Sequence, residues 1–400
     1  MKRTFRYKAR LTAGQQQRAD YQLMLLRRLY NAALEQRIAA WRTHQKTLTF
    51  YDQERELTGL RAAFPEYAAM DRKLEESTLF SLHGAFRGFF RRIKAGEKPG
   101  FPRFKGRHRF KSMTYRQTGW KLEGNRLTLS GIGTFKLFLS RPYRGDIKTV
   151  TLKQDACGDW FVSLSCDNVP ARIPPDTGKS IGIDLGLTSL LTTSDGEHVE
   201  NPRHTEAYAR RLRIAQRSMS KKKRGSTRRQ KARQRVAKLH RKVERTRRDN
   251  HFKVAVDLVR RFDLIAAEDL NTKGMAQGWL AKSIHDAAWG QFIEILQCKA
   301  EEAGREVILV DPRGTSQECS GCGVRVPKKL HVRIHCCDGC GLVLDRDVNA
   351  ARNILARSGA IGERCRSWGV VMTREHYGNG DRQLPDQERT AKAATEDPHE

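Results

Sequence analysis

Two pairs of cysteines near the C-terminal end of the chain have the residue types and spacing of a metal site. Cys319 and Cys322, and again Cys337 and Cys340, enclose two residues, each pair is followed by glycine, and 14 residues lie between the pairs. Two thiolates on one tight turn can hold an edge of a tetrahedron, and glycine suits the unusual dihedral angles of that turn. The two knuckles predict a four-sulfur zinc site, which is structural because four protein ligands leave no open position for water.

The remaining cysteines fit no second site. The interval between the knuckles is one residue short of the usual range, so a redox pair or chance spacing stays as an alternative. Cys336 could compete with Cys337, but only Cys337 makes a two-residue gap with Cys340. Ordinary buried or incidental thiols are expected at Cys157, Cys166, Cys298 and Cys365. An odd total of nine cysteines in 400 residues does not suggest a disulfide framework and indicates a reducing compartment.

Acidic residues at the ends of expected strands and helices form a second candidate site. Asp184 lies inside an apolar strand, Glu268 ends another, and Asp345 and Asp347 begin a helix after the cysteines. A charge within a strand is costly unless a cation compensates it. Three acids brought into one cleft could bind two divalent ions about 4 Å apart, which would activate water and stabilise the leaving oxygen in phosphodiester hydrolysis.

Each acid also has a second interpretation. The string Gly182-Ile183-Asp184-Leu185-Gly186 also resembles the phosphate loop of actin-like ATPases, so Asp184 could belong to such a loop instead. Glu268 could be a surface acid at a strand end, as could Asp269. Asp345 could serve only as the N-cap of the helix that follows it, a position where Asp is favoured.

The elements that position these residues follow from hydrophobic periodicity. Helical spacing covers residues 15–41 and 72–93, a Gly/Pro break follows at 100–105, and short strands alternate through 120–166, so the N-terminal half predicts a helical insertion in or beside a small β-barrel. The second half alternates strands and helices after a linker. Its expected elements are the linker 169–175, the strand 180–186, the hairpin turn 194–196, the helical region 203–248, the strand 264–268, the helix 286–304, the strand 307–310 and the helix 348–357.

The net charge points to a nucleic-acid partner. The chain has 76 Lys and Arg against 45 Asp and Glu, a formal charge of +31. Residues 203–248 alone hold 20 Lys or Arg and two acids, so this region must be solvated or covered by a ligand. Neutralised phosphates release counterions and add affinity, which favours a polyanion over a supercharged or ribosome-associated surface.

Several of these motifs, in their order, resemble the TnpB family, transposon-encoded nucleases of the RuvC type related to the single-protein type V CRISPR effectors. The resemblance rests on Gly182–Gly186, Ala267-Glu268-Asp269-Leu270, the two cysteine knuckles and the string Asp345-Arg346-Asp347-Val348-Asn349-Ala350-Ala351-Arg352-Asn353. Gly100–Phe104 and Ser316-Gln317 also fit the family, and the resemblance extends over roughly residues 1–358.

The resemblance implies a multidomain α+β chain. Its RNase H-like (RuvC) α/β core would be interrupted by a four-cysteine zinc ribbon, and an N-terminal wedge-like β-barrel would carry a helical recognition insertion. The implied segments are a β-barrel at 1–12 and 106–175, a recognition domain at 13–105, a nuclease core at 176–314 and 344–368, a zinc ribbon at 315–343 and a disordered tail at 369–400.

The resemblance also implies a function, an RNA-guided DNA endonuclease that needs divalent metal. Asp184, Glu268 and Asp347 would be the catalytic carboxylates and the ligands of Mg²⁺ or Mn²⁺, with Asp345 in reserve for the third position. Zn²⁺ would sit on the four knuckle cysteines. A structured guide RNA from the transposon end would direct cleavage of double-stranded target DNA beside a short motif. Nucleic-acid contacts are expected at Arg103, Lys105, Lys221, Lys222, Lys223, Arg224, Arg228 and Arg229.

Other functions stay open at this level. They are a nuclease-inactive RNA-guided repressor of the same family, a type V effector, a transposase or accessory DNA-binding protein that acts without RNA, and a zinc-ribbon binder without an active site. All three acids are present, which favours the nuclease. No apolar run reaches the roughly 18 residues of a membrane span and no signal peptide is found, so we expect a protein of the cytoplasm. The resemblance further implies a prokaryotic protein at the nucleoid, and we expect a monomer.

Overall fold

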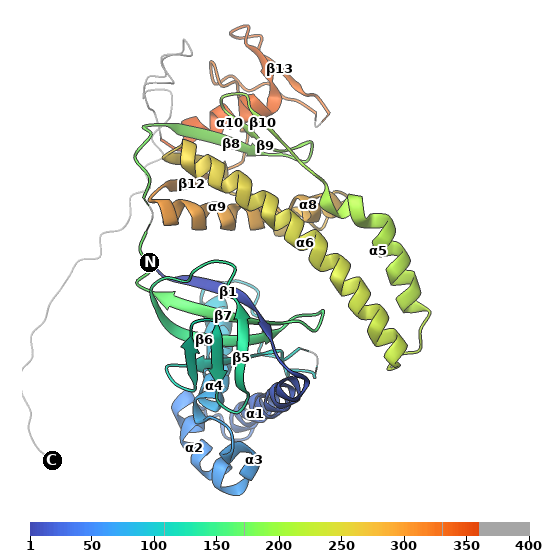
Figure 1. The fold of residues 1–400 in the computed structure, drawn as a ribbon. Helices are drawn as coiled ribbons and strands as arrows, with labels where there is room; N and C mark the ends of the chain where they lie inside the picture. Colours follow the sequence, from blue (N-terminus) through green and yellow to red (C-terminus); the bar gives the residue numbers. More distant parts are fainter. Residues whose placement is uncertain (108, 172, 330, 360–400) are drawn as a thin grey trace, which may run out of the picture. The chain divides into compact units, whose positions relative to one another are not determined.

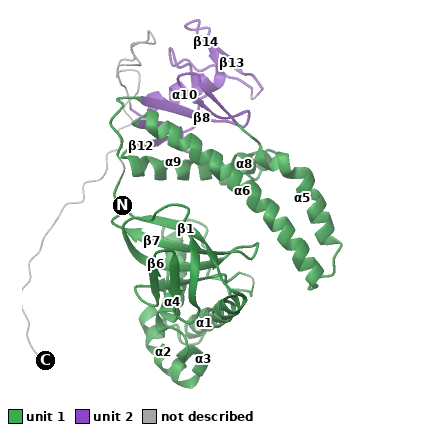
Figure 2. Ribbon diagram, in the orientation of Figure 1, with its two compact units in different colours: residues 1–179, 201–263, 271–307 green, residues 180–200, 264–270, 308–400 purple. Residues whose placement is uncertain are grey.

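The computed structural model describes residues 1–107, 109–171, 173–329 and 331–359, and these residues form two compact units. Unit 1 contains Met1–Lys179, Asn201–Asp263 and Asn271–Val307, whereas unit 2 is assembled from Ser180–Glu200, Leu264–Leu270 and the chain from Ile308 (Figure 2). The expected tail at 369–400 and the thiol of Cys365 lie outside the described residues. Among the helices described, none has the length and apolar character needed to cross a membrane.

A seven-stranded antiparallel sheet in unit 1 is nearly closed (Figure 1). Its strands follow the order β2-β6-β7-β1-β5-β4-β3, so β2 and β3 are the two edges. Only residues 117–119 join these edges, which therefore must lie close together. The strands are β1 (Arg3–Arg10), β2 (Ser112–Arg116), β3 (Trp120–Glu123), β4 (Arg126–Leu129), β5 (Gly133–Phe138), β6 (Asp146–Gln154) and β7 (Trp160–Asp167). Within the region 120–166, where short strands are expected, β3 and β4 form a hairpin. Gly124 lies in the turn between them with a left-handed φ of 57°.

Helices α1 (Ala13–His44) and α4 (Arg72–Lys94) share the core of this sheet, as the periodicity at 15–41 and 72–93 predicts. Two further helices, α2 (Phe50–Ala63) and α3 (Pro65–Ala68), were not anticipated by the hydrophobic pattern. A local signal for α2 does exist. Thr49 and Asp52 form a reciprocal capping box at its start, which satisfies two backbone N–H groups that a helix end leaves free.

The basic region forms a helical hairpin, as expected. It consists of α5 (His204–Ser220) and α6 (Thr227–Arg261), which pack against each other. The helix expected at 286–304 is α9 (Trp289–Ala303). Two short helices that were not expected precede it, α7 (Thr272–Met275) and α8 (Ala281–Ala287), and a break separates α8 from α9. The break lies at Ala288, whose left-handed φ of 51° ends one helix and begins the next. Neither glycine nor proline marks that residue, so the pattern could not place the break.

A five-stranded sheet is the frame of unit 2, with the order β10-β9-β8-β11-β12. Its strands are β8 (Ser180–Leu185), β9 (Ser189–Thr193), β10 (His198–Glu200), β11 (Leu264–Glu268) and β12 (Glu306–Val310). β8 pairs antiparallel with β9 and parallel with β11, and the turn expected at 194–196 joins β9 to β10. Helix α10 (Arg346–Arg357) packs on β8, β9 and β11, and the short hairpin β13 (Ile334–Cys336) and β14 (Val343–Asp345) precedes it.

Candidate metal centres

The four knuckle cysteines meet in unit 2. Their sulfur atoms all lie within 4.8 Å of one another, with 3.6 Å between Cys319 Sγ and Cys340 Sγ and 3.5 Å between Cys322 Sγ and Cys337 Sγ. A tetrahedral zinc with Zn–S bonds of about 2.3 Å needs sulfur atoms roughly 3.8 Å apart. The donor set and its spacing therefore fit Zn²⁺. Cys336 is exposed and lies outside the cluster, as the two-residue gap predicts.

Backbone hydrogen bonds and left-handed glycines fix the turn in each of the two knuckles. Gly323 and Gly341, which follow the second cysteine of each knuckle, have left-handed φ angles of 76° and 72°. Each donates its N–H to the carbonyl of the first cysteine, Cys319 or Cys337, and so closes the turn. The backbone N–H of Cys340 lowers the pKa of the Cys337 thiol to about 7, whereas burial raises the pKa of the Cys319 thiol.

Asp184 and Glu268 lie side by side at the ends of parallel strands. The register pairs Ile183 of β8 with Ala267 of β11, and each acid is the next residue along its strand. Neighbouring positions in a parallel ladder present their side chains to the same face of the sheet. Two carboxylates from distant parts of the sequence are thus brought to the same face of the sheet, near the C-terminal ends of β8 and β11.

Helix α10 brings further acids to the same place. Asp345 caps the helix, since its Oδ1 accepts from the backbone N–H of Asp347 at 2.8 Å and of Val348 at 3.1 Å. Asp345 is therefore the N-cap of α10. Asp347 lies in the first turn, where it faces Arg333 with 3.6 Å between Nη1 and Oδ2.

Electrostatics links the acids to one another. Burial raises the pKa of Asp184 well above its usual range, and the charges of Glu268 and Asp347 raise it further, while Arg346 opposes them. Burial also raises the pKa of Glu268. Like charges gathered in a half-buried place are what a divalent cation relieves, and carboxylate oxygens are ligands for Mg²⁺ or Mn²⁺. Oxygen donors of this kind fit such ions, although among the described His, Cys, Asp and Glu side chains only the four cysteines form a cluster close enough to hold an ion.

Two residues at this site were not found from the sequence. Thr315 is 3% exposed, and its hydroxyl lies 2.5 Å from Oε1 of Glu268. Arg333 reaches Asp347 and also donates to Thr188 Oγ1 at 3.3 Å. Neither belongs to a repeated or periodic pattern, because each meets its partner through the fold rather than along the chain.

The predicted nucleic-acid contacts lie mostly at the turn between α5 and α6. Lys221, Lys223, Arg224 and Arg228 are exposed there. Arg229 instead closes the turn, because its Nη1 donates to the carbonyls of Met219, Ser220 and Lys222. Lys222 Nζ donates to the backbone carbonyl of Ser218 at 3.2 Å.

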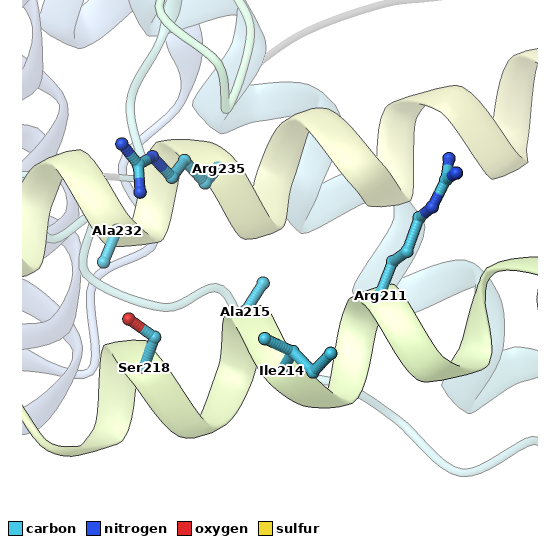
Figure 3. Close-up of a pocket in the computed structure, with 6 residues that line it drawn as sticks. All are labelled: Arg211, Ile214, Ala215, Ser218, Ala232 and Arg235. Atoms are coloured by element: carbon cyan, nitrogen blue, oxygen red, sulfur yellow. The ribbon is translucent and has the colours of Figure 1, made fainter.

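A cavity of about 300 Å³ lies between α5 and α6 (Figure 3). Its residues are Arg211, Ile214, Ala215, Ser218, Ala232 and Arg235. This lining combines two exposed arginine side chains with the apolar side chains of Ile214, Ala215 and Ala232.

Arg103 and Lys105 follow the Gly/Pro break. Arg103 is exposed, whereas Lys105 is half-buried, with its backbone held by Asn31 of α1 and its ammonium 5.3 Å from the ring centre of Tyr30. Arg103 is therefore the freer of the two to meet a ligand.

Comparisons with known proteins agree on one kind of relative. Residues 163–278 match a family model described as a probable transposase, and residues 289–354 match the Cas12f1-like TNB domain. A putative RNA-guided DNA endonuclease of Streptomyces pristinaespiralis is 36% identical over 366 residues, 89% of either chain. The putative RNA-guided DNA endonuclease InsQ of Escherichia coli (strain K12) is 30% identical over 305 residues, 72% of this chain and 74% of that protein.

A solved structure shows the same fold at lower identity. The Cas12f1 chain in a complex with single guide RNA and target DNA is similar with a TM-score of 0.57 and 16% identity, covering 85% of this chain and 82% of that chain.

Proposed function

The chain belongs to the TnpB-like family of putative RNA-guided DNA endonucleases, and we propose that it cleaves target DNA with the acids of unit 2 under the direction of a bound guide RNA. The observation that supports the proposal is the placement of Asp184 and Glu268 on neighbouring parallel strands, together with the effect of the charges of Glu268 and Asp347 on the pKa of Asp184. On this basis the five-stranded sheet with α10 is a RuvC-type core.

The three acids act together as ligands in this proposal. Asp184 and Glu268 present carboxylate oxygens from adjacent strand ends, and Asp347 presents its own from the helix that packs on those strands. Mg²⁺ or Mn²⁺ bound by them would supply the Lewis acidity that phosphodiester hydrolysis needs. The three elements bring the donors to the same part of unit 2 before any substrate arrives. Burial keeps their charges from being screened by bulk water.

The other parts of the chain have binding roles. Zn²⁺ on the four cysteines would hold the knuckles as a structural ribbon, and the segments expected from the sequence would be the barrel, recognition, core and ribbon domains. The basic hairpin α5–α6 would contact phosphates of the guide RNA or of duplex target DNA. A protein with these substrates works at the nucleoid of a prokaryotic cell.

The test is to express the protein with its flanking genomic DNA, purify it and sequence the RNA that comes with it. The same preparation is then given Mg²⁺ and duplex DNA that matches the RNA. We expect a discrete RNA and cleavage that is lost in Asp184→Ala but kept in Glu200→Ala, an exposed acid of the same sheet. A discrete RNA with binding but no cleavage would support the repressor, and absence of RNA would overturn the guided mechanism.

A further inference from the structure

Two buried amides on α10 have no part in the proposed chemistry. Asn349 is fully buried and Asn353 is 7% exposed, and they lie four residues apart on the face of the helix that packs inward. Apolar residues would fill such a face without any need for hydrogen-bond partners. The reason for amides must therefore lie in what they bind.

Both amides hold the segment that leads into the first cysteine knuckle. Asn349 Nδ2 and Asn353 Nδ2 each donate to the backbone carbonyl of Glu318 at 2.7 Å. Asn349 Oδ1 accepts from the backbone N–H of Ser320 at 2.9 Å, inside the knuckle of Cys319. The knuckle backbone is thus fixed to α10 from both sides of the first cysteine.

The same network continues to Glu268. Asn353 Nδ2 also donates to the backbone carbonyl of Thr315 at 2.8 Å. The Thr315 hydroxyl has one hydrogen and two acceptors, Glu268 Oε1 at 2.5 Å and the carbonyl of Pro312 at 3.0 Å, so the shorter contact goes to the carboxylate. Glu268 is 8% exposed, and this hydroxyl fixes one of its two oxygens.

We propose that Thr315 is a positioning residue for Glu268, and that Asn349 and Asn353 link its position to the four-cysteine site. The order of contacts is the Cys319 knuckle, Asn349, the Glu318 carbonyl, Asn353, Thr315 and Glu268. Filling of the cysteine site by zinc then sets how tightly the acids bind a divalent ion. This inference rests on the proposed function, because it takes Glu268 as a ligand of that ion.

The first test measures Mn²⁺ binding to the purified full-length protein by electron paramagnetic resonance, without substrate. Thr315→Val keeps the shape of the side chain and removes the donor, and Thr315→Ser keeps the donor. Loss of a residue that orients a metal ligand weakens metal binding about 10–100-fold, so we expect about 10-fold weaker Mn²⁺ binding in Thr315→Val and recovery in Thr315→Ser. Equal Mn²⁺ affinity in Thr315→Val and the unmodified protein would overturn the positioning role.

Two controls separate this inference from the proposed site itself. Zinc content and melting temperature should be unchanged in Thr315→Val. If either changes, the deciding comparison is Thr315→Ser, which should have normal zinc content, a normal melting temperature and normal Mn²⁺ affinity. Asp184→Asn should abolish Mn²⁺ binding at the acids. If Mn²⁺ binds Asp184→Asn as before, the acid site fails, whatever Thr315 does.

The second test asks whether the two metal sites are coupled. Zinc is removed with a chelator, the chelator is dialysed away, and Mn²⁺ affinity is compared with that of the zinc-loaded protein. We expect about 10-fold weaker Mn²⁺ binding without zinc, and a smaller effect of zinc in Thr315→Val, because effects on one network are not additive. Mn²⁺ affinity that is independent of zinc, or fully additive losses, would overturn the link.

Discussion

Gly182 of β8 lies directly against the backbone carbonyl of Ala351 in α10, and a Cβ at Gly182 would overlap that oxygen. The backbone of β8 and the helix can therefore approach more closely than any larger residue allows. This approach places Asp184, two residues along the strand, and Asp347, four residues before Ala351, at the same end of the packed pair.

Gly182→Ala should consequently destabilise unit 2. Insertion of a methyl group into a tight contact costs about 1–3 kcal/mol, and here the neighbouring atoms are helix backbone that cannot turn away. We expect a lower free energy of unfolding in denaturant and loss of cleavage. Gly84→Ala is the control, since Gly84 lies in α4 with open space around its Cα. Equal stability of Gly182→Ala and Gly84→Ala would contradict the close approach.

Asp184→Asn should make the metal-free protein more stable while it removes the response to metal. The pKa of Asp184 is raised in the folded state, so its charged form is penalised there, and stability falls as pH rises through that pKa. Above that pKa the variant lacks this penalty, so its melting temperature should be higher than that of the unmodified protein. Mg²⁺ should raise the melting temperature of the unmodified protein and of Glu200→Gln, but not that of Asp184→Asn. A variant that Mg²⁺ stabilises as well as the unmodified protein would remove Asp184 from the site.

The four-cysteine cluster is predicted from the sequence and confirmed by the structure, and the same local reading of the sequence singles out the acids as candidates. Asp184 lies inside one short apolar run and Glu268 ends another, and each knuckle occupies four residues. Their meeting depends on the parallel register of β8 and β11, which no local pattern contains but which the family resemblance implies.

The residues that support the site are harder to find. Thr315 and Arg333 touch Glu268 and Asp347 across gaps of 47 and 14 residues in the chain, so only the fold pairs them. Asn349 and Asn353 do carry a signal in the sequence, because two polar residues four apart on an otherwise apolar helix face need buried hydrogen-bond partners. The break at Ala288 has none, because alanine favours helix.

Zinc removal should loosen the ribbon before the rest of unit 2. Among the described residues of 315–345, the named helices and strands are limited to the short strands β13 and β14, and the four clustered cysteines lie in this segment. Replacement of Cys319 and Cys322 by serine should speed backbone hydrogen exchange in 315–345 and impair cleavage. Cys336→Ser is the matched control, an exposed thiol outside the cluster. Full cleavage by the double serine variant would refute the structural role of zinc.

Acid should destabilise unit 1 through His251 of α6. Burial lowers the pKa of His251 to about 4, with Arg247 adding to the effect, and the ring packs 5.6 Å from that of Phe292. Because the folded pKa is below the ordinary 6.5, the unfolded chain binds more protons between these values, and stability is lost as pH falls from 6.5 to 4.

His251→Phe should remove much of that loss, about 3 kcal/mol in the free energy of unfolding between pH 7 and pH 4. Denaturant unfolding at both pH values checks this result. Burial also lowers the pKa of His204, so part of the slope should remain until both are replaced. His44→Gln, at the exposed end of α1, should leave the slope as it is. An unchanged slope in His251→Phe would show that this histidine is not buried in neutral form.

The turn between α5 and α6 should set the salt dependence of nucleic-acid binding. Replacement of Lys221, Lys222, Lys223 and Arg224 by glutamine removes four charges from a turn that Arg229 closes through backbone carbonyls, so the hairpin should keep its fold. Each lost phosphate contact reduces the slope of log affinity against log salt by about 0.7–0.9. We therefore expect a slope shallower by roughly 3 if all four side chains meet phosphates. Lys253→Gln, an exposed lysine of α6 paired with Asp249, is the control. Filter binding of the co-purified RNA from 50 to 400 mM salt measures the slope, and equal slopes in the two variants would place the phosphate contacts elsewhere.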